Sequence, residues 1–278
     1  MAPTKASSTG WMSSRLSLSE AWLTISRELI GMMSSLVFGM IPMGAAGPFL
    51  KPTLATMLVG VLPIVALMML AKKRPTNFEL GIDMSNWLRH SLVAAACVVG
   101  FALFINILGR LMPSLGGEAG GDSGFGVGFG MDIALLLGGI VIAPLFEELA
   151  YRVAILRPLH DGLRTWSTGS KAVLRVVISV AVAALMFTLP HATPGQSKFI
   201  PYVLIAVFFC LIYVFSGSLV CVIMAHAFQS AYAWGSLVLA ANKVGAPTPL
   251  LLGLCVAGPI IVLGGLWVMS RIFGSSRD

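Results

Sequence analysis

Long, uninterrupted runs of apolar residues constrain the fold of this chain more than any other feature. About eight such runs are long enough to cross a bilayer as a helix. They lie at about 29–50, 53–71, 91–113, 132–154, 173–190, 199–216, 219–241 and 249–270. Because the runs are continuous and do not alternate apolar with polar residues, they indicate helices and not the strands of a membrane barrel. The predicted fold is therefore all-α, a polytopic transmembrane helical bundle of about eight spans.

The composition agrees with this fold class. The chain is 57% hydrophobic and only 10% charged, whereas soluble domains carry about 25% charged residues. The net charge of +7 then indicates contact with anionic membrane lipids and gives no reason to expect a nucleic acid partner. Residues 1–28 are predicted to be a polar cytoplasmic segment without a cleavable signal peptide, and residues 29–278 the transmembrane bundle.

The distribution of positive charge predicts the orientation in the membrane. With the N-terminus inside, 14 of the 18 Lys and Arg residues fall on the inner side, leaving Lys51, Arg110, Lys198 and Lys243 outside. By the positive-inside rule, this predicts a multi-pass protein of the cytoplasmic membrane with both termini in the cytoplasm. Arg157 and His160 fall in an inner loop of this topology, so both are expected at the surface.

Two adjacent carboxylates, Glu147 and Glu148, close the fourth apolar run, where a charged side chain is costly. Consecutive helical residues are about 100° apart, so the two carboxylates point in different directions. Arg152 follows Glu148 by four residues, a spacing at which they can pair on one helix face. Glu147 is then available for another interaction. A helix that ends in water, where neither carboxylate needs a partner, would explain the same two residues.

Two histidines also lie in apolar surroundings: His191 ends the fifth run, and His226 lies inside the seventh. A single buried histidine is usually a structural hydrogen-bond donor, but two imidazoles and a carboxylate can together activate a water molecule. Glu147 would be the general base, while an imidazole holds the water or stabilises the oxyanion. The same three side chains match a His₂Glu zinc site, so zinc and metal-free mechanisms both stay open. The predicted reaction class is hydrolysis.

Three motifs around these residues resemble those of a known family. They are Glu147-Glu-Leu-Ala-Tyr-Arg152 for EExxxR, Phe187-Thr-Leu-Pro-His191 for FxxxH, and His226-Ala-Phe-Gln-Ser230 for the start of HxxxN/D. In this order, on the fourth, fifth and seventh spans, they resemble the CPBP family of intramembrane proteases. That family includes CAAX prenyl endopeptidases and bacteriocin-processing types. The resemblance covers about residues 132–241, the predicted protease-like core.

The resemblance implies a role for each motif residue. Glu147 would activate the attacking water with His191 as its partner, Glu148 and Arg152 would form a supporting pair, and His226 would help to form the oxyanion site. Phe187 would be a supporting residue. Ser230 stands where the family has Asn or Asp, and its hydroxyl reaches less far than an amide.

The function predicted from these features is an intramembrane endopeptidase that hydrolyses peptide bonds of membrane-embedded or lipidated substrates. A catalytically inactive scaffold or chaperone on the same fold is the first alternative, and Ser230 is its main support. A proton-coupled transporter that uses the same buried Glu and His is the second. One geometric conflict remains. Straight helices with these bounds would separate Glu147 from His191 by more than about 10 Å in depth, unless the fifth span is tilted or the bounds differ.

Overall fold

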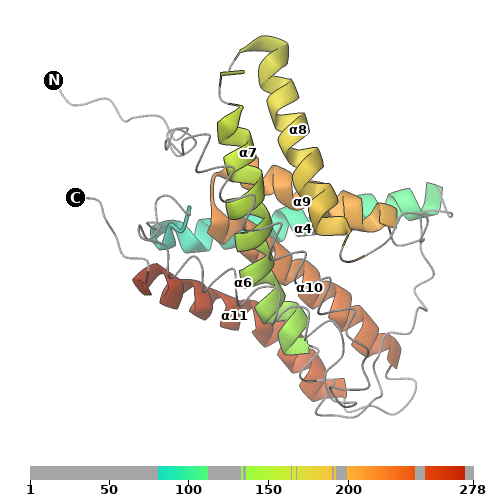
Figure 1. Ribbon diagram of the computed structural model, residues 1–278. Helices are drawn as coiled ribbons and strands as arrows, with labels where there is room; N and C mark the ends of the chain where they lie inside the picture. The colour runs from blue at the N-terminus through green and yellow to red at the C-terminus, as the bar shows by residue number, and fades with distance from the viewer. Residues whose placement is uncertain are drawn as a thin grey trace, which may run out of the picture.

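The computed structural model describes residues 81–111, 133, 136–163, 165–166, 168–189, 191, 199–241 and 248–272 (Figure 1). In this part of the chain every regular element is a helix, which confirms the all-helical prediction. The elements are η2 (Met84–Asn86), α4 (Trp87–Leu111), η4 (Gly138–Ile142), α6 (Ala143–Glu148), η5 (Leu149–Leu156), α7 (Arg157–Gly162), α8 (Gly169–Thr188), α9 (Phe199–Ser216), α10 (Leu219–Ala241) and α11 (Thr248–Ile272).

Four of the described helical stretches are long and apolar enough to cross a membrane: Met84–Leu111, Gly169–Thr188, Phe199–Ser216 and Pro249–Arg271. Many large apolar side chains of α4 and α11 are exposed, as expected for surfaces that face lipid. The expected spans at 29–50 and 53–71 lie outside the described residues, so the count of eight is not confirmed. The predicted bounds 199–216 and 219–241 agree with those of α9 and α10.

The fourth predicted span does not end at residue 154, because helical backbone continues without a break from η4 through α6 and η5 to the end of α7 at Gly162. The elements η4 and η5 are π-helical, with backbone bonds that reach five residues back. Ala143 N–H bonds the Gly138 carbonyl, and Arg157 N–H bonds the Arg152 carbonyl. Pro144, in the first turn of α6, cannot donate a backbone hydrogen bond, which favours such an irregularity. Alpha-helical α6 is thus held between two wider π segments, an arrangement that recurs at functional sites.

This longer helix removes the conflict in depth between Glu147 and His191. After Gly162 the chain turns and returns as α8, which packs against α7, η5 and α9. Figure 1 shows α7 and α8 as a pair of neighbouring helices that extends beyond the level of α9 and α4. The chain therefore moves roughly 20 Å away from Glu147 along one helix and comes back along the next. His191, just past the end of α8, returns to the level of Glu147.

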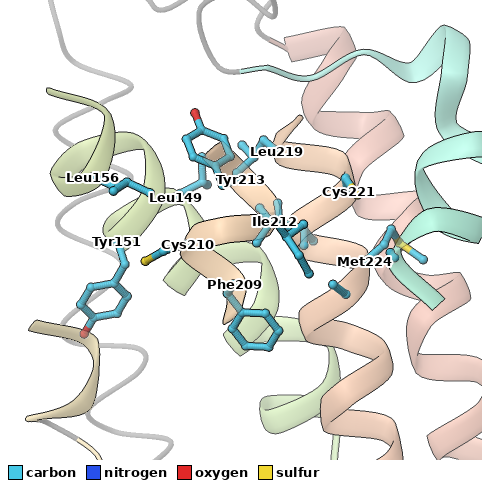
Figure 2. Packing of buried hydrophobic residues seen from close by; sticks show 14 of the residues in the cluster. Leu149, Tyr151, Leu156, Phe209, Cys210, Ile212, Tyr213, Leu219, Cys221 and Met224 are labelled. Atoms are coloured by element: carbon cyan, nitrogen blue, oxygen red, sulfur yellow. The ribbon is translucent and has the colours of Figure 1, made fainter. Parts of the chain in front are cut away.

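Helix α10 lies at the centre of the described bundle, in contact with α4, α6, η4, α9 and α11. Every residue from 219 to 227 is buried, and a helix that is apolar all round is typical of such a central position. Figure 2 shows the core between η5, α9 and α10, built from Leu149, Tyr151, Leu156, Phe209, Cys210, Ile212, Tyr213, Leu219, Cys221 and Met224. This core fixes α9 and α10, which bring side chains to the site described below.

The turn between α9 and α10 rests directly on the segment before α4. Leu219 N–H donates to the Gly81 carbonyl at 2.9 Å, and Ser218 Oγ accepts a hydrogen bond from Cys221 N–H at 3.2 Å. Gly81 and Gly217 have φ values of +71° and +65°, in the left-handed region that glycine adopts without strain. A Cβ atom on Gly81 would lie only 2.9 Å from the Gly217 carbonyl oxygen. Gly81 therefore allows a close backbone approach that a side chain at this position would prevent.

We expect Gly81→Ala to destabilise the protein by about 1–3 kcal/mol, because it combines left-handed backbone strain with a steric clash. Gly100→Ala is the matched control, since that glycine is helical in α4 and its Cβ would meet open space. The control should be neutral or slightly stabilising, because alanine is the better helix former. The measurement is thermal unfolding of the purified protein in detergent. A Gly81→Ala protein that unfolds at the same temperature as the Gly100→Ala protein would contradict this account.

Candidate active site

The two adjacent carboxylates of α6 are both buried and face different partners. Glu148 is 0% exposed and Glu147 is 7% exposed. Glu148 contacts Arg152 and one edge of His226, while Glu147 faces His191 and the other nitrogen of His226. The structure therefore brings together Glu147, Glu148, Arg152, His191 and His226 in a single cluster.

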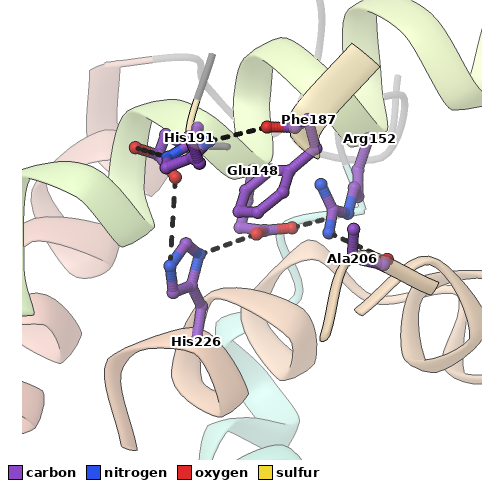
Figure 3. A network of polar contacts seen from close by, with 7 residues as sticks. Glu148, Arg152, Phe187, His191, Ala206 and His226 are labelled. Carbon is purple, nitrogen blue, oxygen red and sulfur yellow. Dashed lines mark hydrogen bonds and ion pairs between the residues drawn. The ribbon is translucent and has the colours of Figure 1, made fainter. Parts of the chain in front are cut away.

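Glu148 and Arg152 form an ion pair that is fully shielded from solvent. Arg152 Nε lies 2.9 Å from Glu148 Oε2, and both side chains are 0% exposed. The guanidinium also donates from Nη2 to the Ala206 carbonyl (Figure 3), at 3.4 Å. It lies over the rings of Phe187 and Phe209, at 5.2 and 5.7 Å from the ring centres. A buried charge without its partner costs several kcal/mol. These two residues therefore depend on each other.

The imidazole of His226 is oriented by Glu148. His226 Nδ1 lies 2.8 Å from Glu148 Oε1. Figure 3 shows this contact as a dashed line. A carboxylate paired with a guanidinium accepts hydrogen bonds, so the hydrogen of this bond belongs to His226 Nδ1. His226 Nε2 is then directed at Glu147, whose Oε2 atom is 3.9 Å away. Glu148 thus has two neighbours, Arg152 and His226, one on each oxygen.

A backbone carbonyl orients His191 in a comparable way. The residue follows the end of α8 in a turn closed by a bond of 2.9 Å from His191 N–H to the Thr188 carbonyl. Its Nδ1 atom lies 2.6 Å from the Phe187 carbonyl, which can only accept, so Nδ1 carries the hydrogen. His191 Nε2 then faces Glu147 Oε1 at 3.6 Å.

Glu147 is therefore approached by two imidazole Nε2 atoms whose Nδ1 atoms are already engaged. The Glu147 carboxylate and the Nε2 atom of His191, whose ring carries its hydrogen on Nδ1, are both acceptors, so a donor is needed to join them. The separations of 3.6 and 3.9 Å are longer than direct hydrogen bonds, and a water molecule commonly bridges polar atoms at such distances. The arrangement is suited to hold a water beside a carboxylate that can take its proton.

The donor types of Glu147, His191 and His226 are those of a His₂Glu zinc site. In the described part of the chain, however, no group of three or more His, Cys, Asp or Glu side chains is arranged so that it could hold a metal ion. Zinc binding by these three side chains therefore stays a prediction from their residue types. The mechanism proposed below uses the side chains alone.

The remaining motif residues lie at different distances from this cluster. Phe187 is buried and stacks on His191, with ring centroids 4.6 Å apart and planes 16° apart. Ser230 lies one helical turn beyond His226 on α10 and is partly exposed, on the side of the helix that His226 occupies. Phe187 thus belongs to the cluster.

Arg157 and His160 are not at the surface, and that expectation was wrong. They are 5% and 4% exposed, and they lie in α7 beside Asp161, which is 5% exposed. Arg157 Nε is 3.7 Å from Asp161 Oδ2, and His160 Nδ1 is 3.8 Å from Asp161 Oδ1. Because a carboxylate four residues away compensates the charge of Arg157, the arginine is tolerated inside the protein. Two arginines counted among the inner positive charges, Arg152 and Arg157, are therefore buried and paired.

The motifs did not reveal the contribution of α9. Tyr202 stacks on His191 at 5.2 Å, Phe209 stacks on His226 at 4.6 Å, and the Ala206 carbonyl accepts a bond from Arg152. None of the three motifs lies on this helix. The only signal in the sequence is the spacing of these residues, at i, i+4 and i+7, which puts them on one helix face. That signal is hidden because the whole span from Phe199 to Ser216 is apolar.

Comparison with known proteins agrees with the motifs. A family model described as Rce1-like, type II CAAX prenyl endopeptidase Rce1-like, matches residues 129–232. This segment includes all seven motif residues named above, and the match confirms the resemblance to the CPBP family of intramembrane proteases. Nothing matches the chain among the curated proteins or among the solved structures.

We expect Arg152→Ala to destabilise the protein by about 3–5 kcal/mol, because it leaves the buried Glu148 carboxylate without its cation. Arg89→Ala is the matched control, since Arg89 is exposed in the first turn of α4. The measurements are the yield of monodisperse protein in detergent and its thermal unfolding. Equal yield and equal unfolding temperature for the two variants would show that the ion pair does not stabilise the fold.

Proposed function

We propose that this protein is an intramembrane endopeptidase that hydrolyses peptide bonds of membrane-associated substrates with a water activated by Glu147. The observation that supports the proposal best is the convergence of Glu147 with His191 Nε2 and His226 Nε2, at 3.6 and 3.9 Å. The family match over residues 129–232 supports the same reaction class.

In the proposed mechanism, Glu147 and His191 share the attacking water. One water hydrogen is directed at the Glu147 carboxylate and the other at His191 Nε2, which can accept because its Nδ1 hydrogen is engaged with the Phe187 carbonyl. Glu147 takes a proton as the water oxygen attacks the peptide carbonyl carbon. The same proton then passes from Glu147 to the leaving nitrogen as the C–N bond breaks.

His226 is proposed to stabilise the oxyanion of the tetrahedral intermediate. Its Nδ1 hydrogen is held by Glu148, so a bond to the oxyanion requires a second hydrogen, on Nε2. The Nδ1 atom of His226 contacts a carboxylate, whereas the Nδ1 atom of His191 contacts a neutral carbonyl. The difference between these two contacts favours water binding for His191 and oxyanion binding for His226.

The proposal also covers the substrates of the protein and its location and topology in the membrane. Membrane-embedded or lipidated proteins and peptides are the proposed substrates, and the cytoplasmic membrane is the proposed location, with both termini in the cytoplasm and about eight spans. The apolar helices and the family match support a membrane protein. Burial of the cluster among α6, α8 and α10 suits a reaction kept apart from bulk water.

The decisive experiment measures cleavage of a fluorogenic lipidated peptide and of a membrane-embedded reporter by the purified full-length protein in liposomes. Glu147→Gln and His226→Ala should each abolish cleavage, because the first removes the base and the second the oxyanion donor. Asp83→Asn is the matched control for Glu147→Gln, since Asp83 is exposed and distant in sequence from the motifs.

Cleavage that persists in Glu147→Gln would refute the protease proposal. A chelator should leave the rate unchanged if the side chains act alone. Loss of cleavage with chelator, restored by added zinc, would instead favour a zinc mechanism.

A catalytically silent scaffold is a second candidate, and Ser230 is the observation in its favour. Ser230 stands where the resemblance implies Asn or Asp, and its hydroxyl is shorter than a carboxamide side chain. In a scaffold, neither Glu147→Gln nor Ser230→Asn should alter the cellular phenotype.

In a working protease, we expect Ser230→Asn to raise kcat, because the longer amide can reach the oxyanion. Loss of one such donor typically costs about 10²–10³ in rate, so a gain of about tenfold or more is expected. Ser236→Asn is the matched control and should leave the rate unchanged, since Ser236 is exposed and lies six residues further along α10. The same cleavage assay in liposomes gives kcat for both variants. An equal rate for the two variants would show that residue 230 does not limit oxyanion stabilisation.

A further inference from the structure

One face of α9 contacts the candidate active site along two helical turns. Tyr202, Ala206 and Phe209 are spaced i, i+4 and i+7, so they share this face. Tyr202 stacks on His191 with centroids 5.2 Å and planes 25° apart, and Phe209 stacks on His226 with centroids 4.6 Å and planes 27° apart. Between them, the Ala206 carbonyl accepts a hydrogen bond from Arg152. A single helix thus contacts both histidines and the buried arginine.

The stacking contacts supply what the hydrogen bonds of the histidines lack. Each Nδ1 atom is fixed by one bond, to Glu148 for His226 and to the Phe187 carbonyl for His191. A hydrogen bond on Nδ1 restricts rotation about the Cβ–Cγ bond but tolerates a range of angles, so the ring plane keeps some freedom to tilt. An aromatic ring stacked on the imidazole fixes the plane, and the plane sets the direction of Nε2. The orientation of both Nε2 atoms toward Glu147 therefore depends on rings as well as on hydrogen bonds.

The aromatic contacts around the two histidines are unequal. His191 has Phe187 at 4.6 Å and Tyr202 at 5.2 Å, both nearly parallel to it. His226 has one nearly parallel ring, that of Phe209, while Phe187 meets it edge-on at 6.1 Å and 65°. Removal of the Phe209 ring should therefore free His226 more than removal of the Tyr202 ring frees His191.

Phe209 also connects His226 to the buried charge. The Arg152 guanidinium lies 5.7 Å from the centre of the Phe209 ring, and Phe209 is 0% exposed. A cation near an aromatic ring and an imidazole stacked on that ring hold the ring in a defined position. Arg152, Phe209 and His226 therefore form a continuous series of contacts from the ion pair to the proposed oxyanion site.

We propose that α9 is the positioning helix of this active site, with Tyr202 and Phe209 as positioning residues that set the ring planes of His191 and His226. The proposal rests on the proposed endopeptidase function. It adds a helix that carries none of the three motifs, and it assigns these two aromatic side chains an effect on turnover and not on substrate binding.

The kinetic test compares Tyr202→Leu and Phe209→Leu with wild type in the full-length protein in liposomes. Both variants should lower kcat by about 10- to 100-fold, because a tilted imidazole ring no longer directs its Nε2 atom at the reacting atoms. The KM should change less than about threefold. The effect of Phe209→Leu should be the larger one. Tyr202→Phe should keep the wild-type kcat, because it keeps the ring.

Phe208→Leu is the matched control for Phe209→Leu. Phe208 is the adjacent residue of the same helix, and its ring stacks on Phe101 of α4, with centroids 4.3 Å apart. This variant also removes a stacked ring from α9 but should leave kcat unchanged. A loss as large in Phe208→Leu as in Phe209→Leu would indicate general damage to the helix and overturn the proposal. An equal loss in Tyr202→Phe and Tyr202→Leu would assign the effect to the hydroxyl and also overturn it.

A spectroscopic test does not depend on cleavage. The chain has four histidines, and their imidazole signals can be resolved by NMR after selective ¹³C labelling and assigned with single His→Gln variants. A stacked ring shifts the carbon-bound protons of an imidazole upfield. Phe209→Leu should move the His226 signal downfield, and Tyr202→Leu the His191 signal, whereas Phe208→Leu should move neither.

The outcomes separate this inference from the proposed function. If Glu147→Gln retains cleavage, the protease proposal fails, and the NMR shifts still show whether the two rings orient the histidines. If Glu147→Gln abolishes cleavage while Tyr202→Leu and Phe209→Leu keep wild-type kcat, only the positioning role is overturned. Unmoved histidine signals in folded Tyr202→Leu and Phe209→Leu proteins would overturn it as well. If a leucine variant fails to fold, the same measurements on Phe209→Met and Tyr202→Met replace it.

Discussion

The buried ion pair between Glu148 and Arg152 is the interaction on which the rest of the site depends. With 2.9 Å between Nε and Oε2 and no exposure of either side chain, neither charge has water as an alternative partner. Each ion therefore needs further polar contacts, and each finds them in the site: Glu148 at His226 Nδ1, and Arg152 at the Ala206 carbonyl and above two phenylalanine rings. Contacts to this one buried pair thus connect elements from α6, η5, α8, α9 and α10 around a common point.

The irregular helix that carries this pair explains how a membrane protein can place two carboxylates side by side. Segments η4 and η5 are wider than an α-helix, and α6 between them carries both glutamates. Glu148 contacts Arg152 and His226 Nδ1 inside the bundle, while Glu147 remains directed at the Nε2 atoms of the two histidines. The helix then continues through α7 to Gly162, so that the return along α8 brings His191 to the same level. A span that ended at residue 154 would have left His191 too deep.

Hydropathy and spacing predicted much of this arrangement, and the errors have a common cause. The bounds of α9 and α10, the pairing of Glu148 with Arg152, and the selection of Glu147, His191 and His226 all came from local patterns. Arg157 was expected at the surface because it was read as a loop charge, yet Asp161 follows it at the i+4 spacing that predicted the first pair. An arginine with a carboxylate at that spacing can enter the interior, so charge alone was a poor guide to exposure.

The sequence by itself determined the fold class and the residue types of the candidate site: an all-helical membrane protein with a carboxylate, two imidazoles and a supporting ion pair in a fixed order along the chain. Spacing and residue type suffice for this, because a buried charge in an apolar segment must be paired or functional. Only the tertiary structure decided which nitrogen of each histidine faces Glu147 and which rings hold the imidazoles. Those rings lie on α9, where nearly every residue is apolar and hydropathy cannot distinguish one aromatic side chain from the next. Phe208 and Phe209 are adjacent and chemically identical, and packing alone places one against Phe101 and the other against His226.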